Sequence, residues 1–190
     1  MAPLEINFLI EKFKISHNYL EFGAGYSTML ARSFTDLNVF SIETDVDYCL
    51  FIKSKLAEKG EFKNVTVIHA DIGPTRDWGW PELHADATKF PNYLWTPITF
   101  AKAKRFKPDL ILVDGRFRVA TFLTCLVEFP GVEIIFDDYV DRKHYHAVEE
   151  ILRPVKRVGR IVLFKAPKRL SRKKILRSLA LIREYVGDPS

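Results

Sequence analysis

The segment NYLEFGAGYST, residues 18–28, sets the architecture of this protein. Residues 18–22 form a short, continuous apolar run, which is typical of a strand buried on both faces. Gly23 and Gly25 follow at once and allow a sharp turn and a close approach to a ligand. Residues 27–34 then show helical periodicity. A strand, a glycine turn and a helix in this order predict the first unit of a parallel α/β sheet.

The same alternation continues along the chain. Further strands are expected at residues 39–43, 65–70, 110–114 and 132–137, and further helices at residues 46–59, 119–129 and 141–152. Asp45 is the expected N-cap of the helix at residues 46–59, and Gly60 is its expected C-terminal stop. Residues 155–158 and 161–166 flank Gly159 and predict a hairpin, so that the last strand runs antiparallel.

The predicted fold class is therefore α/β: a doubly wound, mostly parallel, seven-stranded sheet with an antiparallel last strand and helices on both faces. We expect residues 1–190 to form a single domain, because this length is sufficient for one core. Its additions are an N-terminal helix at about residues 3–15, a long loop at about residues 72–108 and a basic C-terminal helix at about residues 171–185. Loops of this length are usually lids or binding loops.

Charge and composition narrow the class of protein. Twelve of the 29 Lys and Arg residues, but two of the 24 acidic residues, follow residue 152, so this part carries +10 and the rest −5. The pI of about 9.1 therefore does not by itself indicate a nucleic-acid binder. The two cysteines, Cys49 and Cys125, exclude a disulfide framework. No apolar run is long enough for a membrane span and no signal peptide is recognised, so a cytoplasmic protein is expected.

Each predicted parallel strand delivers an acidic residue to its carboxyl end. Glu21 lies in the first strand and Glu43 ends the second, while Asp71, Asp114 and Asp137 come at the ends of the other three. Ligands of open parallel sheets bind outside this edge. A row of carboxylates there predicts a functional site, with Glu43 placed to accept hydrogen bonds from ribose hydroxyls.

The glycine turn departs from the dinucleotide fingerprint, because Thr28 stands where a third glycine is required. An acid two residues before the first glycine suits a cationic ligand that lacks pyrophosphate. With this turn and the strand-end acids, residues 18–166 resemble the class I S-adenosylmethionine-dependent methyltransferases. The resemblance implies S-adenosylmethionine as cofactor and methyl transfer to an oxygen of a small molecule. The cofactor-binding residues that it implies are Glu21, Gly23, Gly25, Ser27, Glu43, Asp71, Ile72 and Asp114.

Asp114, Asp137 and Asp138 resemble the magnesium ligands of macrocin- and catechol-type O-methyltransferases. The resemblance implies Mg²⁺, a hard cation that takes oxygen ligands and lowers the pKa of a substrate hydroxyl. Arg116 and Arg118 depart from that pattern. Such arginines either neutralise the carboxylates and remove the need for a metal, or hold an anionic substrate in a bidentate clamp. The alternative role of Asp138 is to cap the following helix.

The predicted catalytic groups are Asp114, Asp138 and His144. A neutral imidazole suits a general base near pH 7, and the alternative for His144 is an ordinary surface histidine. Trp78 and Trp80 either line a substrate pocket or anchor the long loop on the core. The predicted substrate-binding residues are Trp78, Trp80, Arg116, Arg118 and Tyr139.

Two other functions stay open. One is a nicotinamide-dependent oxidoreductase, against which Thr28 argues, because it replaces the third glycine of the dinucleotide fingerprint. The other is a non-catalytic module that binds the cofactor, or a polyanion through the basic C-terminal helix. Such a helix normally packs on the sheet with its charges in water. The alternatives are that its basic face binds RNA, an anionic membrane surface or a second copy of the chain. The expected partner is a small-molecule acceptor, and an anionic acceptor is one option. Nucleic acid is not an expected partner.

Overall fold

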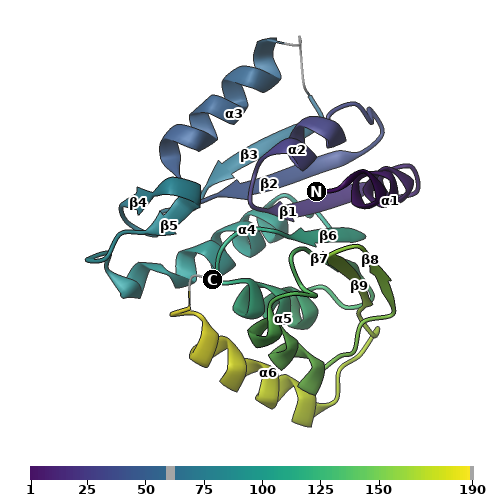
Figure 1. Ribbon diagram of the computed structural model, residues 1–190, viewed down its shortest axis with the longest axis vertical. Coiled ribbons are helices and arrows are strands. Elements are labelled where there is room, and N and C mark those ends of the chain that lie inside the picture. The colour runs from purple at the N-terminus through teal and green to yellow at the C-terminus, as the bar shows by residue number, and fades with distance from the viewer. Residues whose placement is uncertain (59–62, 189–190) are drawn as a thin grey trace.

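The computed structural model describes residues 1–58 and 63–188. Its centre is a seven-stranded sheet of order β3-β2-β1-β6-β7-β9-β8 (Figure 1). Strands β1, β2, β3, β6 and β7 run parallel, and β9 pairs antiparallel with β7. The strands of this sheet are β1 (Asn18–Phe22), β2 (Asn38–Glu43), β3 (Val65–His69), β6 (Leu110–Val113), β7 (Glu133–Phe136), β8 (Lys156–Val158) and β9 (Ile161–Lys165). The predicted fold class is confirmed.

The order of the strands places a switch point between β1 and β6. From β1 the chain moves outward to β2 and β3, and it then returns to place β6 on the other side of β1. The crossovers therefore leave opposite faces of the sheet at this point, and a crevice opens at the carboxyl ends of the two strands. This is the edge at which the sequence places its row of acids.

Helices cover both faces of the sheet (Figure 1). One face carries α1 (Pro3–Phe13), α2 (Tyr26–Ala31) and α3 (Val46–Glu58), and the other carries α4 (Pro91–Ala103), α5 (Arg118–Glu128) and α6 (Arg172–Tyr185). The predicted stop of α3 at Lys59 and Gly60 lies outside the described residues. Ser171 caps α6, since its hydroxyl accepts a hydrogen bond from the backbone N–H of Lys174.

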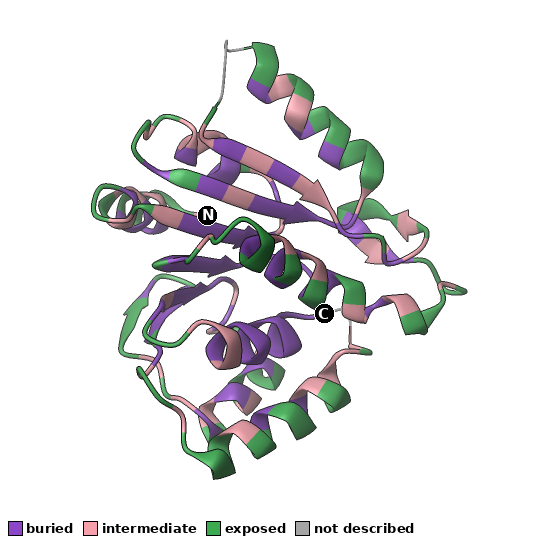
Figure 2. Cartoon of the chain, turned by 180° about the vertical axis from the view of Figure 1, so that it is seen from behind, coloured by how far each residue is buried: buried purple, intermediate pink, exposed green. Residues whose placement is uncertain are grey.

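Two hydrophobic cores result from the alternation of side chains along the buried strands. Leu20 and Phe22 of β1 point into the core beneath α4, α5 and α6, whereas Tyr19 points into the core beneath α1, α2 and α3. In Figure 2 the strands and α5 are largely buried, while α3 and α6 turn exposed residues outward. The continuous apolar runs in the sequence therefore reflect strands that are covered on both sides.

The prediction of a long loop at residues 72–108 is wrong for the second half of this segment. Residues 91–103 form the regular helix α4, which packs Tyr93, Leu94 and Ile98 against the sheet. Pro91 begins the helix and Pro97 lies inside it. The prolines made this segment look irregular, but a proline in the first turn is compatible with a helix. Burial of one apolar face compensates for the hydrogen bond that Pro97 does not make.

The first half of that segment is a small hairpin beside the sheet. It consists of β4 (Thr75–Arg76), the 3₁₀ turn η1 (Asp77–Gly79) and β5 (Trp80–Pro81), followed by the 3₁₀ turn η2 (Ala87–Lys89). The Thr44 hydroxyl donates a hydrogen bond to the carbonyl of Gly79, and the Thr75 hydroxyl donates one to Asp45. These contacts dock the hairpin next to the carboxyl end of β2.

The helix predicted at residues 141–152 is also different in the structure. Lys143–Glu150 form the 3₁₀ helix η3, with Tyr145 and Val148 buried. In a 3₁₀ helix every third side chain falls on the same face, and Tyr145 and Val148 are three residues apart. The N-terminal helix α1 ends at Phe13, two residues before its predicted end. Among the described residues, no helix has the length and apolar character needed to cross a bilayer.

The burial difference between α5 and α6 allows a matched test of the fold. Leu123 on α5 is fully buried, whereas Leu176 on α6 is 57% exposed. We expect Leu123→Ala to lower the free energy of unfolding by about 2–5 kcal/mol, because it leaves a cavity. Leu176→Ala should change it by less than about 0.5 kcal/mol. Urea unfolding of both variants measures this difference, and equal losses would contradict the position of α6.

Candidate active site

Parallel pairing brings the ends of four strands together. Phe22 pairs with Ile42 and Val113, and Val113 pairs with Phe136. The ladder continues one residue further, because the N–H of Gly23 bonds to the carbonyl of Ile42 and that of Asp114 to the carbonyl of Phe22. Gly23, Glu43, Asp114 and Asp137 therefore lie in adjacent positions along one edge of the sheet.

The backbones of Gly23 and Gly115 nearly touch at the switch point. Gly23 has φ = +99°, and a Cβ there would lie 2.8 Å from the backbone nitrogen of Gly115. Gly115 is equally restricted, because a Cβ there would collide with the hydroxyl of Tyr93. The absence of a side chain at both positions therefore allows the ends of β1 and β6 to pack closely against each other and against Tyr93.

Glu21 supports the glycine turn from beneath. Its fully buried carboxylate accepts hydrogen bonds from the hydroxyls of Tyr19, Ser41 and Thr28, and the hydroxyl of Thr28 in turn accepts one from the N–H of Gly25. Burial raises the pKa of Glu21 from its ordinary value, while the hydroxyl donors oppose this. Glu21 therefore does not line the cleft but holds the loop at residues 23–28 in place.

Glu43 ends β2 and turns its carboxylate into the cleft. Its Oε1 atom accepts hydrogen bonds from the backbone N–H groups of Thr44, at 2.7 Å, and Asp45, at 3.0 Å. These bonds fix the orientation of the carboxyl group. Burial raises the pKa of Glu43, and the two N–H groups act in the opposite direction.

A cleft of about 1490 Å³ runs along this edge of the sheet. One half is acidic and lies over β1 and β2, and the other carries three arginines and lies over β6 and β7. Gly115 and Asp114 are at the junction of the two halves. The acidic half includes Gly23, Gly25, Ser27, Glu43, Asp45, Asp47 and Asp77, and the other half includes Arg116, Arg118, Asp138 and Arg142.

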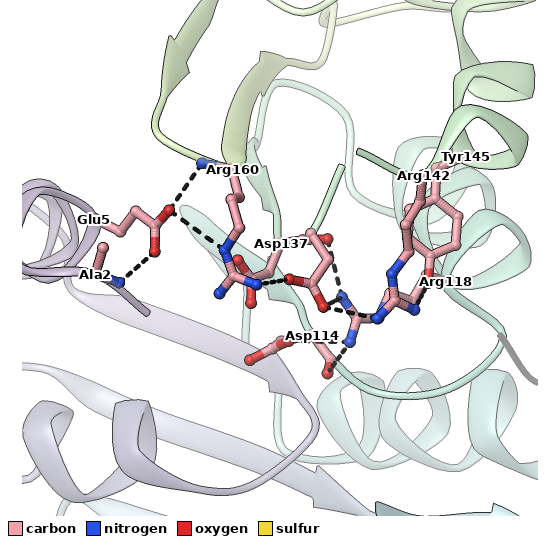
Figure 3. A network of polar contacts seen from close by, with 9 residues as sticks. Ala2, Glu5, Asp114, Arg118, Asp137, Arg142, Tyr145 and Arg160 are labelled. Atoms are coloured by element: carbon pink, nitrogen blue, oxygen red, sulfur yellow. Dashed lines mark hydrogen bonds and ion pairs between the residues drawn. The ribbon is translucent and has the colours of Figure 1, made fainter. Parts of the chain in front are cut away.

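The arginine-containing half includes a network of ion pairs (Figure 3). Asp138 is the common partner of Arg118, Arg142 and Arg160 in this network. Arg160 contacts its Oδ1 atom at 2.6 Å, and Arg142 contacts its Oδ2 atom at 3.1 Å. Arg118 lies between Asp138 and Asp114, at 3.5 Å and 3.2 Å from their oxygens. The buried Glu5 of α1 extends the network by accepting a hydrogen bond from the backbone N–H of Arg160. Asp138 has φ = +54°, a strained conformation that these contacts maintain.

Asp114 is the carboxyl group at the junction of the two halves. Burial raises its pKa well above the ordinary value, and the neighbouring carboxyl of Asp137 raises it further, against the opposing charge of Arg118. Asp137 is itself buried, and its Oδ1 atom has no hydrogen-bond partner among the described residues. Asp114 therefore faces the cleft, while Asp137 lies behind it.

The acidic residues do not fit the predicted magnesium ion. The oxygens of Asp138 face three guanidinium groups, and one oxygen of Asp114 faces Arg118. Within residues 1–58 and 63–188, no group of three His, Cys, Asp or Glu side chains is arranged to hold a metal ion. The predicted cap role of Asp138 is not observed either, because Arg142 is the N-cap residue of η3.

Besides Glu21 and Asp137, four predicted site residues lie outside the lining of this cleft. Asp71 is exposed and bonds to Gly73 and Lys89, and Ile72 is part of the core. Tyr139 is buried, and its hydroxyl donates a hydrogen bond to Glu149. His144 is exposed on η3 with its ring against Tyr145. Their predicted roles stay predictions.

The two tryptophans differ in environment although both line the cleft. The Trp78 side chain is 88% exposed on a backbone with φ = +64°. Trp80 is half-buried, and the guanidinium of Arg116 lies 4.7 Å from the centre of its ring. Trp80 thus anchors the hairpin and shapes the cleft, so both of its predicted roles are compatible with its position.

Several residues of the site were not predicted from the sequence, and Tyr93, Arg142 and Arg160 are the most informative of them. Tyr93 lines the junction, and its buried hydroxyl has no partner among the described residues. Arg142 and Arg160 belong to the network around Asp138. Tyr93 was not predicted because the prolines near it indicate a loop where the structure has the helix α4. Arg142 had a signal, since it lies four residues after Asp138, but Arg160 is brought in only by the antiparallel β9.

The sheet order and the glycine turn, together with an acid after the second strand, define a Rossmann-like class of nucleoside-binding proteins. No protein-family model matches the sequence, and no curated protein does. Among solved structures, a methyltransferase-like protein from Silicibacter pomeroyi is 32% identical, with TM-score 0.86, over 100% of this chain and 96% of its own. The chain therefore belongs to the class I S-adenosylmethionine-dependent methyltransferases, as the sequence resemblance predicted.

Two more distant structures share the fold. The cofactor-bound protein Rv0187 from MTB is 14% identical, with TM-score 0.63, over 89% of this chain and 82% of its own. An O-methyltransferase from Bacillus cereus, crystallised with S-adenosylhomocysteine (SAH), is 16% identical, with TM-score 0.54, over 97% of this chain and 69% of its own. At these identities the similarity concerns the architecture alone.

The glycine turn offers a matched pair of variants. Gly23→Ala places a Cβ at φ = +99° against Gly115, whereas the nearest atom to a Cβ at Gly25 is 3.9 Å away. We expect Gly23→Ala to lower the free energy of unfolding by at least about 1–2 kcal/mol, because of the left-handed backbone and the clash. Gly25→Ala should retain nearly all of the wild-type free energy of unfolding. The measurement is urea unfolding without ligand, and a larger loss for Gly25→Ala would refute the close backbone contact.

Proposed function

We propose that the protein transfers a methyl group from S-adenosylmethionine to an oxygen atom of a small anionic molecule. The observation that carries this proposal is one continuous cleft, in which the glycine turn and Glu43 face the arginines of the other half across Asp114. The family assignment supports S-adenosylmethionine as the cofactor. The arginines in one half of the cleft support a negatively charged acceptor.

The acidic half fits S-adenosylmethionine. Gly23 and Gly25 line the cleft where the amino-acid part would lie, and the fixed carboxylate of Glu43 is oriented to accept hydrogen bonds from the ribose hydroxyls. Asp45, Asp47 and Asp77 surround this half, and their negative charge attracts a sulfonium cation. When bound, S-adenosylmethionine supplies an activated methyl group. Contacts of the adenine with the backbone near Asp71 and Ile72 stay a prediction.

The other half suits an acceptor with a negative charge and a hydroxyl group. Arg116, Arg118 and Arg142 line it. Arg118 is held by carbonyls and carboxylates of the chain itself, so Arg116 and Arg142 are the residues proposed to bind a carboxylate or phosphate of the acceptor. Trp78 and Trp80 line the cleft on the hairpin side and give it apolar walls. Asp114 lies where the two halves meet, so its carboxyl group is placed to take the proton from an acceptor hydroxyl. Most of the rate enhancement then comes from positioning.

Binding of SAH, which remains after S-adenosylmethionine has lost its methyl group, tests the proposed cofactor site. We expect Glu43→Gln to weaken SAH binding by about 1–3 kcal/mol, because charge-assisted hydrogen bonds to the ribose are lost. Glu58→Gln, at the exposed end of α3, is the matched control and should bind as tightly as the wild type. Isothermal titration calorimetry measures both. Unchanged affinity in Glu43→Gln would contradict the proposed cofactor site.

A comparison of acceptors tests the second half. In a methylation assay with hydroxy acids and their neutral amides, we expect transfer to the acids. Arg142→Gln should lower kcat/KM for the acid by about tenfold or more through loss of a charged contact, with little change for an amide. Arg183→Gln, on the exposed face of α6, should change neither. Preference for the amides would contradict an anionic acceptor, and SAH binding without transfer to any acceptor would favour a non-catalytic module.

A further inference from the structure

We propose that the guanidinium of Arg118 is a built-in cation that takes the place of a divalent metal ion between Asp114 and Asp138. The side chain is 4% exposed and lies at the carboxyl ends of β6 and β7. It contacts an oxygen of each carboxylate, at 3.2 Å and 3.5 Å. The acceptor half of the cleft is thereby organised by a residue of the chain and needs no Mg²⁺.

The hydrogen bonds of Arg118 explain how it stays there. Its Nε atom donates to the carbonyl of Gly115 at 2.8 Å, and its two terminal nitrogens donate to the carbonyls of Asp137 and Asp114 at 2.9 Å and 3.0 Å. With the two carboxylate contacts, these account for all five N–H donors of a guanidinium group. Arg118 has no donor left for an acceptor molecule, so it is a positioning residue.

The arginines around Asp138 oppose the binding of a metal ion to this carboxylate. Arg160 occupies its Oδ1 atom, while Arg142 and Arg118 share its Oδ2 atom. Mg²⁺ requires near-octahedral oxygen coordination at about 2.0–2.1 Å. A divalent ion at Asp138 would have to displace at least one guanidinium group and would be repelled by the others. The geometry therefore favours the paired arrangement over metal binding.

The position of Arg118 in α5 supports the same inference. It is the first residue of this helix, where a positive charge is opposed by the helix dipole. Phe117, the residue before it, has φ = +52°, which turns the chain sharply between β6 and α5. A strained turn and a cation at a helix N-terminus are both unfavourable in isolation. Their combination here is stabilised by the carboxylates and carbonyls that the guanidinium reaches.

Binding of Mn²⁺ to the full-length protein tests this inference directly. Mn²⁺ is titrated into the wild type, Arg118→Met and Arg116→Met, and free Mn²⁺ is measured by electron paramagnetic resonance. We expect no saturable binding below millimolar Mn²⁺ in the wild type, because Arg118 occupies the position. Arg118→Met frees the Oδ1 atom of Asp114 and removes one of the three guanidinium groups from Asp138, so it should bind Mn²⁺ at least about tenfold more tightly. Arg116→Met removes a neighbouring buried arginine, whose guanidinium lies against the ring of Trp80, and should behave like the wild type.

Two results would overturn the inference: saturable micromolar binding by the wild type, or a folded Arg118→Met variant that gains no affinity for Mn²⁺. If Arg118→Met does not fold, Arg118→Lys replaces it, because it keeps a cation at this position. Absence of Mn²⁺ binding in Arg118→Lys then supports the inference, and a gain in binding contradicts it. The role in methyl transfer rests on the proposed function, which SAH titration of the same wild-type sample tests separately. Failure of that titration leaves the Mn²⁺ result unaffected.

Discussion

The close contact between the backbones of Gly23 and Gly115 is the constraint on which the site depends. Hydrogen-bonded pairing of β1 with β2 and β6 brings these residues together, because parallel strands that are in register end at the same edge. Any larger side chain at Gly23 would separate β1 from β6 at this edge. Glu43 and Asp114 would then no longer face a common cleft. The buried Glu21 serves the same constraint, since its carboxylate accepts hydrogen bonds from Thr28 after the glycine turn, from Tyr19 of β1 and from Ser41 of β2.

Electrostatics divides the cleft into two parts with different chemistry. The part over β1 and β2 carries carboxylates and attracts a cation, whereas the part over β6 and β7 carries guanidinium groups that are paired with acids. The pairing matters because a buried, unpaired charge is costly. A network that includes Glu5 of α1 and Arg160 of β8–β9 connects the N-terminus and the last hairpin to the site (Figure 3). Elements distant in sequence thereby position a single aspartate.

Local patterns predicted most of the fold and the first half of the site. Continuous apolar runs identified the buried strands, and Gly23 with Gly25 identified the turn, because these signals depend on residues adjacent in the chain. The same kind of reasoning failed for α4, where prolines hid a helix that is stabilised by packing of Tyr93 and Leu94. It also failed for η3, a 3₁₀ helix in which Tyr145 and Val148 are buried. In both cases tertiary burial outweighed local preference.

The chain's own residue order was enough to establish the α/β architecture, the glycine turn and the acid at each strand end. It was not enough to establish which charges meet. Arg118, Arg142 and Arg160 reach Asp138 from α5, the start of η3 and the β8–β9 hairpin, and no spacing rule connects them all. Only the folded arrangement turned a candidate metal site into a cluster of ion pairs, because Coulomb interactions depend on distances in space.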